Sequence, residues 1–287
     1  MKLKTGISII LIGTTLSLAI VSCKKTNTTP TTPTDSDTSV AAENSLAEGI
    51  FNDVQNISDQ ASNNDLKFYS PQYSGNLQDI QSFEKTSCAT ITHDSISSPR
   101  TLIIDFGSSN CLCQDGNNRR GKINISYVGK YRESGSAHTI SFTDYYVNDN
   151  QVIGTKSVTN NGLNANGHTT FTIAVDGQII KANSAGTLTW KSNRTREWLE
   201  GESTKTWTDD VYSITGSTSG SNSNGNSFTS LITTPLHRAL NCHWFDSGVL
   251  EVNQTGKVLK TINFGSGSCD ADATVTILGK TYPITLK

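Results

Sequence analysis

Hydrophobic and polar residues alternate along most of the chain beyond residue 94, which is the period-two pattern of β-strands with one face toward solvent. Within 122–131, for example, Ile123 and Ile125 alternate with Asn124 and Ser126. Turn-forming residues at 148–150, 160–167 and 176–177 separate successive segments, and 216–226 is predicted to be a long polar hairpin loop. The pattern predicts strands at 101–106, 122–131, 139–147, 151–159, 169–175, 186–191, 195–199, 211–218, 227–233, 247–253, 257–264, 273–278 and 281–286.

Residues 39–62 carry a different, helical pattern. Their apolar residues recur at spacings of three and four, which places them on one stripe of a helix (Leu46, Ile50, Phe51, Val54, Ile57). Thr38 or Ser39 is suited to cap its start, and we expect Asp53 and Asp59 to face water. Because a lone helix of this length is marginal in water, its apolar stripe should cover an apolar surface.

These patterns predict an all-β fold. Strands follow one another too closely for crossover helices, so we expect antiparallel pairing throughout. Residues 63–287 would form a single β domain, either a sandwich or a curved open sheet, with the amphipathic helix 39–62 packed on it. A hydrophobic content of only 34% favours sheets with large wet faces over a thick core.

The first residues resemble the signal of a bacterial lipoprotein. Lys2 and Lys4 precede an uncharged apolar run, 7–21, which has the length of a secretory core and is short for a transmembrane helix. The run ends in Ile-Val-Ser-Cys, which is similar to a lipobox, with Cys23 in the position that receives lipid. The resemblance implies that 1–22 is a signal peptide and that Cys23 becomes the acylated N-terminus; the alternative is a plain signal or uncleaved anchor with an incidental cysteine. Several acyl chains on one residue would hold the protein stably at a membrane.

The segment 23–38 is predicted to be a disordered tether. After Cys23 it consists of Lys, Thr, Asn, Pro, Ser and Asp, so it has no apolar residue to bury. Lys24, rather than Asp, follows the lipid position, which by resemblance to sorting in double-membraned bacteria permits transport to the outer membrane. Whether the protein faces the periplasm or the cell surface stays open.

Two parts of the β domain, 88–132 and 242–287, share a short pattern that suggests two related halves. In each, an aliphatic strand leads into Asp/Asn-Phe-Gly-Ser and then a cysteine, Cys111 or Cys269. In each, another cysteine, Cys88 or Cys242, lies upstream. Since an exported chain meets an oxidising space, the repeat suggests the disulfides Cys88–Cys111 and Cys242–Cys269.

Once Cys23 is lipidated, five cysteines remain, so one has no partner. The repeat leaves Cys113 over. Cys113 could instead pair with Cys88 and leave Cys111 free.

The globular part also resembles uncharacterised lipoproteins of Bacteroidota. The resemblance rests on the run 111–122, CLCQDGNNRRGK, and on the ending 262–270, INFGSGSCD. It covers residues from about 40 to the C-terminus. It implies location and architecture, but no chemistry.

The sequence shows no strong catalytic motif, and no cofactor is expected. A formal charge of −2 offers no basic footprint for nucleic acid. The candidate zinc ligands are Cys111 and Cys113, or His237, Cys242 and His243, and the candidate calcium ligands are Asp209 and Asp210, or Asp270 and Asp272. None of these sets has the spacing of a known site, so we predict no metal. The carboxylates Glu197, Glu200 and Glu202 could only hydrolyse glycosides if two of them faced each other across a cleft.

Tryptophans on neighbouring predicted strands are the remaining binding candidates. Exposed rings could stack on sugars with polar side chains between them, and the weak candidates are Trp190, Trp198, Trp207, Arg194 and Arg196. Packing in the core or between strands is the interpretation that the sequence favours, since aromatic residues are common in strands, and arginine stacked on tryptophan is a further alternative. We therefore expect a lipid-anchored cell-envelope protein with a non-catalytic structural or binding role, whose partners are the membrane and a glycan or another envelope protein. The alternatives are a glycan-binding surface lipoprotein that uses exposed tryptophans, and a hydrolase with an unrecognised site.

Overall fold

The computed structural model describes residues 37–69, 88–113, 115–204, 206 and 208–286. Residues 35–287 form one compact unit, whereas 1–34, with the predicted signal peptide and most of the tether, lie outside the described residues. Among the described residues, no helix is both long and apolar enough to span a bilayer.

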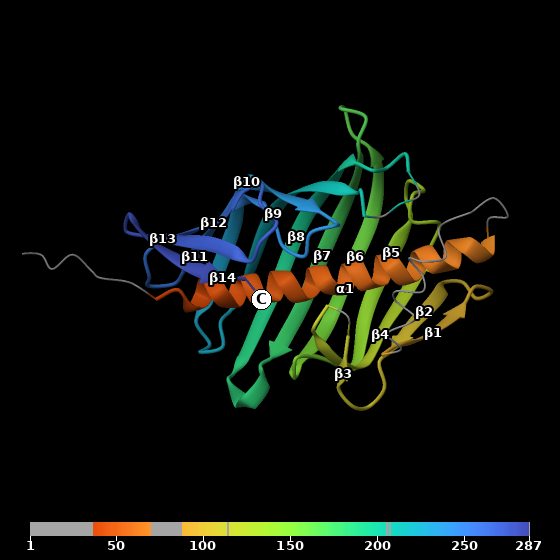
Figure 1. Cartoon of the computed structure of the whole chain (residues 1–287), viewed down its shortest axis with the longest axis horizontal. Helices are drawn as coiled ribbons and strands as arrows, with labels where there is room; N and C mark the ends of the chain where they lie inside the picture. Colours follow the sequence, from red (N-terminus) through yellow and green to blue (C-terminus); the bar gives the residue numbers. More distant parts are fainter. Residues whose placement is uncertain (1–36, 70–87, 114, 205, 207, 287) are drawn as a thin grey trace, which may run out of the picture. The chain divides into compact units, whose positions relative to one another are not determined.

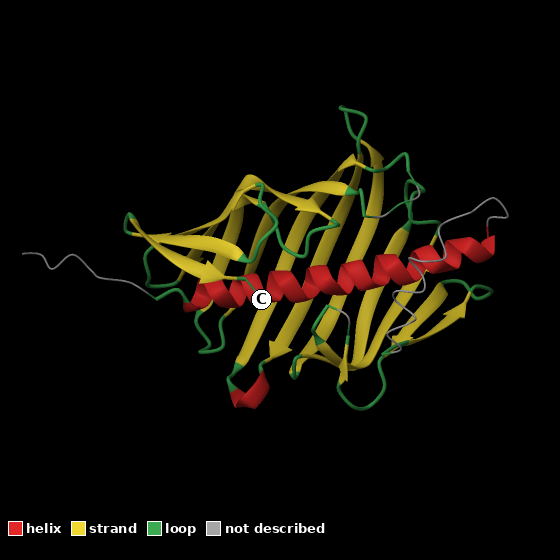
Figure 2. Ribbon diagram, viewed as in Figure 1, coloured by secondary structure: helices red, strands yellow, loops and turns green. Residues whose placement is uncertain are grey.

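The described strands form one antiparallel sheet of 14 strands, with helix α1 (Ser39–Tyr69) lying across them (Figures 1 and 2). Apart from β3, which pairs only with β4, each strand hydrogen-bonds to its neighbours in chain order. The strands are β1 (Thr90–Asp94), β2 (Arg100–Asp105), β3 (Cys111–Leu112), β4 (Asn118–Val128), β5 (Ala137–Val147), β6 (Asn150–Leu163), β7 (Thr169–Ile180), β8 (Thr187–Glu200), β9 (Val211–Ser221), β10 (Ser227–Ala239), β11 (Ser247–Gln254), β12 (Lys260–Ser266), β13 (Asp272–Ile277) and β14 (Lys280–Thr285). The all-β prediction with a packed N-terminal helix is confirmed, and of the two architectures considered the open sheet is the one found.

The sheet curves around the helix. At about 100° per residue, the buried positions of α1 span an arc of about 200°, which is more than a flat sheet can cover. These positions are Val40, Ala41, Glu43, Asn44, Ala47, Glu48, Ile50, Phe51, Val54, Gln55, Ile57, Ser58 and Ala61. The helix contacts β2, β8 and β11, and its length of about 46 Å for 31 residues is enough to cross the strands between them. The predicted stripe was therefore correct but too narrow.

The core lies between α1 and the inner, concave face of the sheet. Phe51 of α1 stacks on Trp190 of β8 with ring centroids 5.4 Å apart. It also lies over Gly177 of β7, where an added Cβ would be 2.2 Å from the phenylalanine ring. Inward-facing residues of the strands from β2 to β13 complete this cluster. A second, smaller cluster around Phe171, Trp198 and Tyr212 also lies in the sheet.

Several predicted boundaries differ from those of the structure, and three of the differences concern segments that were assigned to the wrong element. Asp176 and Gly177 lie inside β7 rather than in a turn, because Gly177 leaves space for Phe51 and Asp176 forms a cross-strand ion pair with Lys191, 2.7 Å between Oδ2 and Nζ. The predicted loop 216–226 is β9 as far as Ser221, followed by a tight turn in which the Asn222 side chain accepts two backbone N–H bonds. The two strands predicted at 186–191 and 195–199 are one strand, β8.

Candidate functional site

The inner face of the sheet is occupied by α1, and two of its polar side chains, Arg194 and Trp190, are paired with the helix. The guanidinium of Arg194 on β8 donates to Glu48 of α1 at 2.7 Å and to the hydroxyl of Thr218 on β9, also at 2.7 Å. The indole Nε1 of Trp190 donates to Asn44 of α1 at 3.1 Å. These side chains are buried, so they serve the attachment of the helix and offer no surface to a ligand.

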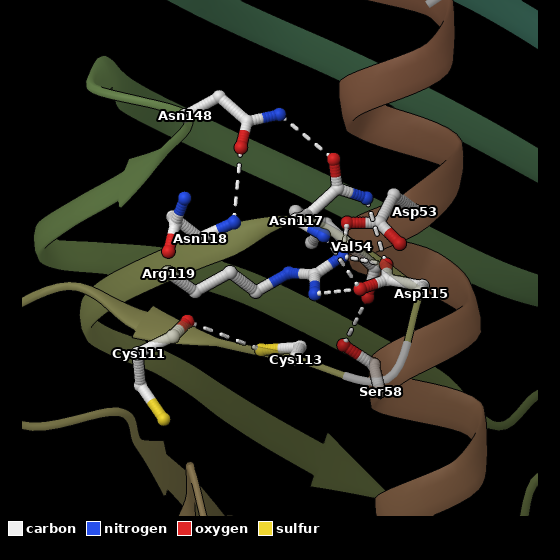
Figure 3. Close-up of polar contacts among 10 residues, drawn as sticks. All are labelled: Asp53, Val54, Ser58, Cys111, Cys113, Asp115, Asn117, Asn118, Arg119 and Asn148. Carbon is white, nitrogen blue, oxygen red and sulfur yellow. Dashed lines mark hydrogen bonds and ion pairs between the residues drawn. The ribbon is translucent and has the colours of Figure 1, made fainter.

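A second buried ion pair joins α1 to β4 (Figure 3). Arg119 donates to Asp53 of the helix at 2.7 Å and to both oxygens of Asp115 at 2.8 and 2.5 Å. Burial opposes ionisation of Asp115, but the hydrogen bonds and charge of Arg119 prevail and lower its pKa to about 2. The expectation that Asp53 faces water is wrong, since the side chain retains only 16% of its exposure. The same expectation for Asp59 is not tested, because the Asp59 side chain lies outside the described part of the structure.

The tryptophans predicted to bind sugars are buried where the structure describes them. Trp190 and Trp198 are each 2% exposed, so neither can stack on a sugar, and packing is the alternative that holds. Arg196 is buried as well and lies over the Tyr212 ring, 4.4 Å from its centroid. Trp207 lies outside the described residues. The sequence favoured packing but could not decide between the two, because aromatic residues alternate with polar ones equally well on an inner face and on an outer face.

The cysteines pair as the repeat suggested. Disulfides join Cys88 to Cys111 and Cys242 to Cys269, and Cys113 is the free cysteine among those described. Cys111 and Cys242 are therefore not available as thiolate ligands. Within the described residues no three His, Cys, Asp or Glu side chains lie together in a way that could hold a metal ion. The common origin of the two halves stays a prediction.

The acidic residues considered for catalysis or calcium make local structural contacts. Glu197 accepts hydrogen bonds from the Asn164 amide and binds His168, each at 2.8 Å, and these bonds lower its pKa. Glu202 accepts a hydrogen bond from the hydroxyl group of Thr169. Asp270 accepts the backbone N–H of Asp272 at 3.0 Å, which is ordinary turn chemistry.

The outer face of the sheet, turned away from α1, carries the candidate site. A hollow of about 600 Å³ lies over β8, β9, β10 and β11. Antiparallel register aligns its lining side chains in two cross-strand rows, since directly opposed residues share one face. One row is Lys191, Ser219, Thr229 and Asn253, and the other is Asn193, Ser217, Leu231 and Glu251. We call this surface, together with Leu259, the outer groove.

The floor of the outer groove is built from short hydrogen-bonding side chains. Ser217 and Ser219 lie at its centre on β9, between longer side chains on β8 and β10. The hollow therefore results from small side chains that lie beside larger ones, and it does not require a gap between the strands. Leu231 and Leu259 form apolar parts of the wall and are 53% and 48% exposed.

The sequence pattern predicted part of the outer groove. Alternation in 247–253 and 211–218 predicted a wet face, and the structure shows which residues lie on it. The loop predicted at 216–226 overlapped the strand at Ser217 and removed Ser219 from that face. Register across four strands is set by contacts between segments far apart in the sequence, so the two rows could not be assembled from the pattern alone.

A buried histidine on the inner face makes the stability sensitive to acid. His138 of β5 is 7% exposed, and its Nε2 has no hydrogen-bond partner among the described residues. Burial and the charge of Arg196 lower its pKa from 6.5 to about 4. Between these values the unfolded chain binds a proton that the folded protein does not, so the free energy of unfolding should fall by up to about 3 kcal/mol as the pH drops from about 6.5 to 4.

This prediction can be tested by urea unfolding of the wild type and of His138→Phe at pH 7.5, 5.5 and 4. The substitution should remove most of the loss between pH 6.5 and 4. His243→Gln, which removes an exposed imidazole, should leave the loss in place. An unchanged pH profile in His138→Phe would contradict the assignment.

Comparison with known proteins adds no further constraint. No family model, no curated protein and no solved structure matches this chain.

Proposed function

We propose that this protein is a lipid-anchored protein of the cell envelope with a non-catalytic binding role, and that the outer groove is its binding surface. The observation that carries the binding role is the division of the sheet into two faces. The inner face is occupied by α1 through buried ion pairs, whereas the outer face carries a hollow of about 600 Å³ lined by groups that can form hydrogen bonds.

The chemistry of the outer groove supports binding rather than bond cleavage. Its ionisable lining residues are Lys191 and Glu251. Lys191 is already paired with Asp176, and a single remaining carboxylate does not make the pair of groups that acid–base catalysis of hydrolysis uses. The carboxylates of Glu197 and Glu202 have local partners and do not line the hollow.

The lipid anchor is supported by the resemblance of Ile20-Val21-Ser22-Cys23 to a lipobox after a short basic and apolar start. The predicted tether up to residue 38 would hold the sheet away from the membrane, since it leads directly into α1 at Ser39. Lys24 after the lipid position supports an outer-membrane destination. The two disulfides, one in each of the related segments, are consistent with an oxidising compartment.

Metabolic labelling with a palmitate analogue tests the anchor. In a bacterial host that processes lipoproteins, the wild type should carry the label and sediment with membranes, and mass spectrometry should find acylated Cys23 at the N-terminus. Cys23→Ala should lose the label. Cys113→Ala is the matched control, because it removes the other cysteine without a disulfide and should keep the label. An unmodified Cys23 thiol, or a start at another residue, would overturn the anchor.

A further inference from the structure

We propose that the outer groove binds a neutral, linear oligosaccharide, held mainly by hydrogen bonds from the floor and with little aromatic stacking. The proposal rests on the binding role proposed above and names its ligand class. It replaces the tryptophan-based mode, because Trp190 and Trp198 are buried on the opposite face.

The floor of the groove matches a ligand rich in hydroxyl groups. Ser217, Ser219 and Thr229 each carry a hydroxyl that can both donate and accept, and the amides of Asn193 and Asn253 add separate donors and acceptors. A ligand that only accepts, such as a phosphate, leaves half of this capacity unused. Sugar hydroxyls also donate and accept, so they can use all of it.

The dimensions favour an extended ligand that crosses the strands. Four adjacent strands, at about 4.8 Å spacing, give the groove a length of about 14 Å in the direction across the sheet. Its two rows lie two residues apart along each strand, or about 6.8 Å, which is the width of a single flat chain rather than of a globular partner. Leu231 and Leu259 can contact the apolar C–H face of sugar rings, as both are about half exposed.

The charges around the groove select against an acidic ligand. Lys191 at one end is neutralised by Asp176, with 2.7 Å between Nζ and Oδ2. Glu251 lies on the β11 side and has no cation opposite it in its row. The groove would therefore repel an anionic chain electrostatically, whereas a neutral chain would experience no such repulsion.

The floor is also rigid, which lowers the entropic cost of binding. Its strands pair on both sides within the sheet, and Thr218 beneath the floor is fixed by its hydrogen bond from Arg194. Short side chains such as serine lose little rotamer freedom when they bind, so weak individual hydrogen bonds can add up to a measurable affinity.

Calorimetric titration of the full, lipidated chain tests the proposal, in a zwitterionic detergent without a sugar headgroup. The probes are neutral hexasaccharides (β-1,4-glucan, β-1,4-mannan and α-1,4-glucan), a wider array of neutral glycans, and oligogalacturonate as the acidic comparison. We expect saturable binding of at least one neutral glycan and at least tenfold weaker binding of the acidic one.

Ser219→Trp fills the centre of the groove and should weaken that binding at least tenfold. Thr139→Trp is the matched control, because Thr139 is an exposed position on β5 outside the groove, and it should bind as the wild type does. Should Ser219→Trp disturb folding, Asn193→Ala with Asn253→Ala removes two amides without adding bulk and should weaken binding in the same direction.

Two results would overturn the ligand class: no neutral glycan bound at millimolar concentration, or binding that the groove variants leave unchanged. Failure of the ligand class and failure of the anchor remain distinguishable. A lipidated protein that ignores glycans contradicts only the ligand, whereas glycan binding by a chain with an unmodified Cys23 contradicts only the anchor.

Discussion

Replacement of Glu48 by alanine is expected to lower the free energy of unfolding by about 3–5 kcal/mol, because it leaves the buried guanidinium of Arg194 without its carboxylate. The side chains of both residues are nearly inaccessible, 6% and 3% exposed, and their nearest charged atoms lie 2.7 Å apart. Urea unfolding followed by circular dichroism measures the change.

Two further variants give this prediction its controls. Asp176→Ala breaks an ion pair of the same length on the outer face, where both side chains are more than 60% exposed, and should cost less than about 1 kcal/mol. The double variant Glu48→Met with Arg194→Met removes both charges and should recover most of the stability that Glu48→Ala loses. Equal losses in Glu48→Ala and Asp176→Ala would show that burial does not set the energy of the pair.

Replacement of Phe51 by alanine is expected to cost about 3–5 kcal/mol, because the ring fills the space between α1 and the centre of the sheet. Its centroid lies 5.4 Å from the Trp190 ring and 6.3 Å from the Phe142 ring. Gly177→Ala should cost about 1–3 kcal/mol for the opposite reason, since its Cβ would lie 2.2 Å from the same ring.

The two substitutions should not add. With Phe51 already replaced by alanine, the new methyl group of Gly177→Ala enters the vacated space, so its effect should be close to zero or stabilising. A double-mutant cycle measured by urea unfolding gives the coupling energy. Additive losses would mean that Gly177 is required for another reason than the phenylalanine ring.

Helix α1, which carries both Glu48 and Phe51, shows which features the sequence pattern predicted correctly and which it did not. The apolar spacing from Leu46 to Ile57 predicted the helix and its buried stripe correctly, because an amphipathic helix must hide that stripe whatever its partner is. Asp53 was placed in water, since a carboxylate is normally exposed. Its burial depends on Arg119, 66 residues further along the chain, and no local pattern records that contact.

The arginines and tryptophans of β8 illustrate the same limit. The sequence predicted two strands here, with Trp190 and Trp198 on neighbouring strands and Arg194 between them. The structure has one strand, β8, and its period-two alternation places Trp190, Arg194, Arg196 and Trp198 together on the buried inner face. The pattern did not say which face is turned inward. Arg194 and Arg196 are polar, so they made this face resemble a solvent-exposed one, although α1 and neighbouring aromatic rings cover them.

The sequence by itself determined the antiparallel strands and the amphipathic helix, because each follows from spacing within a short stretch. Its internal repeat suggested the two disulfides, but only the structure decided between Cys111 and Cys113 as the partner of Cys88. The sequence also carries the lipobox-like start on which the proposed anchor depends. Only the tertiary structure decided that one sheet curves around α1, which charges are buried, and which small polar side chains of β8 to β11 line one groove. Those features depend on register and curvature, which are set jointly by strands and a helix that lie far apart along the chain.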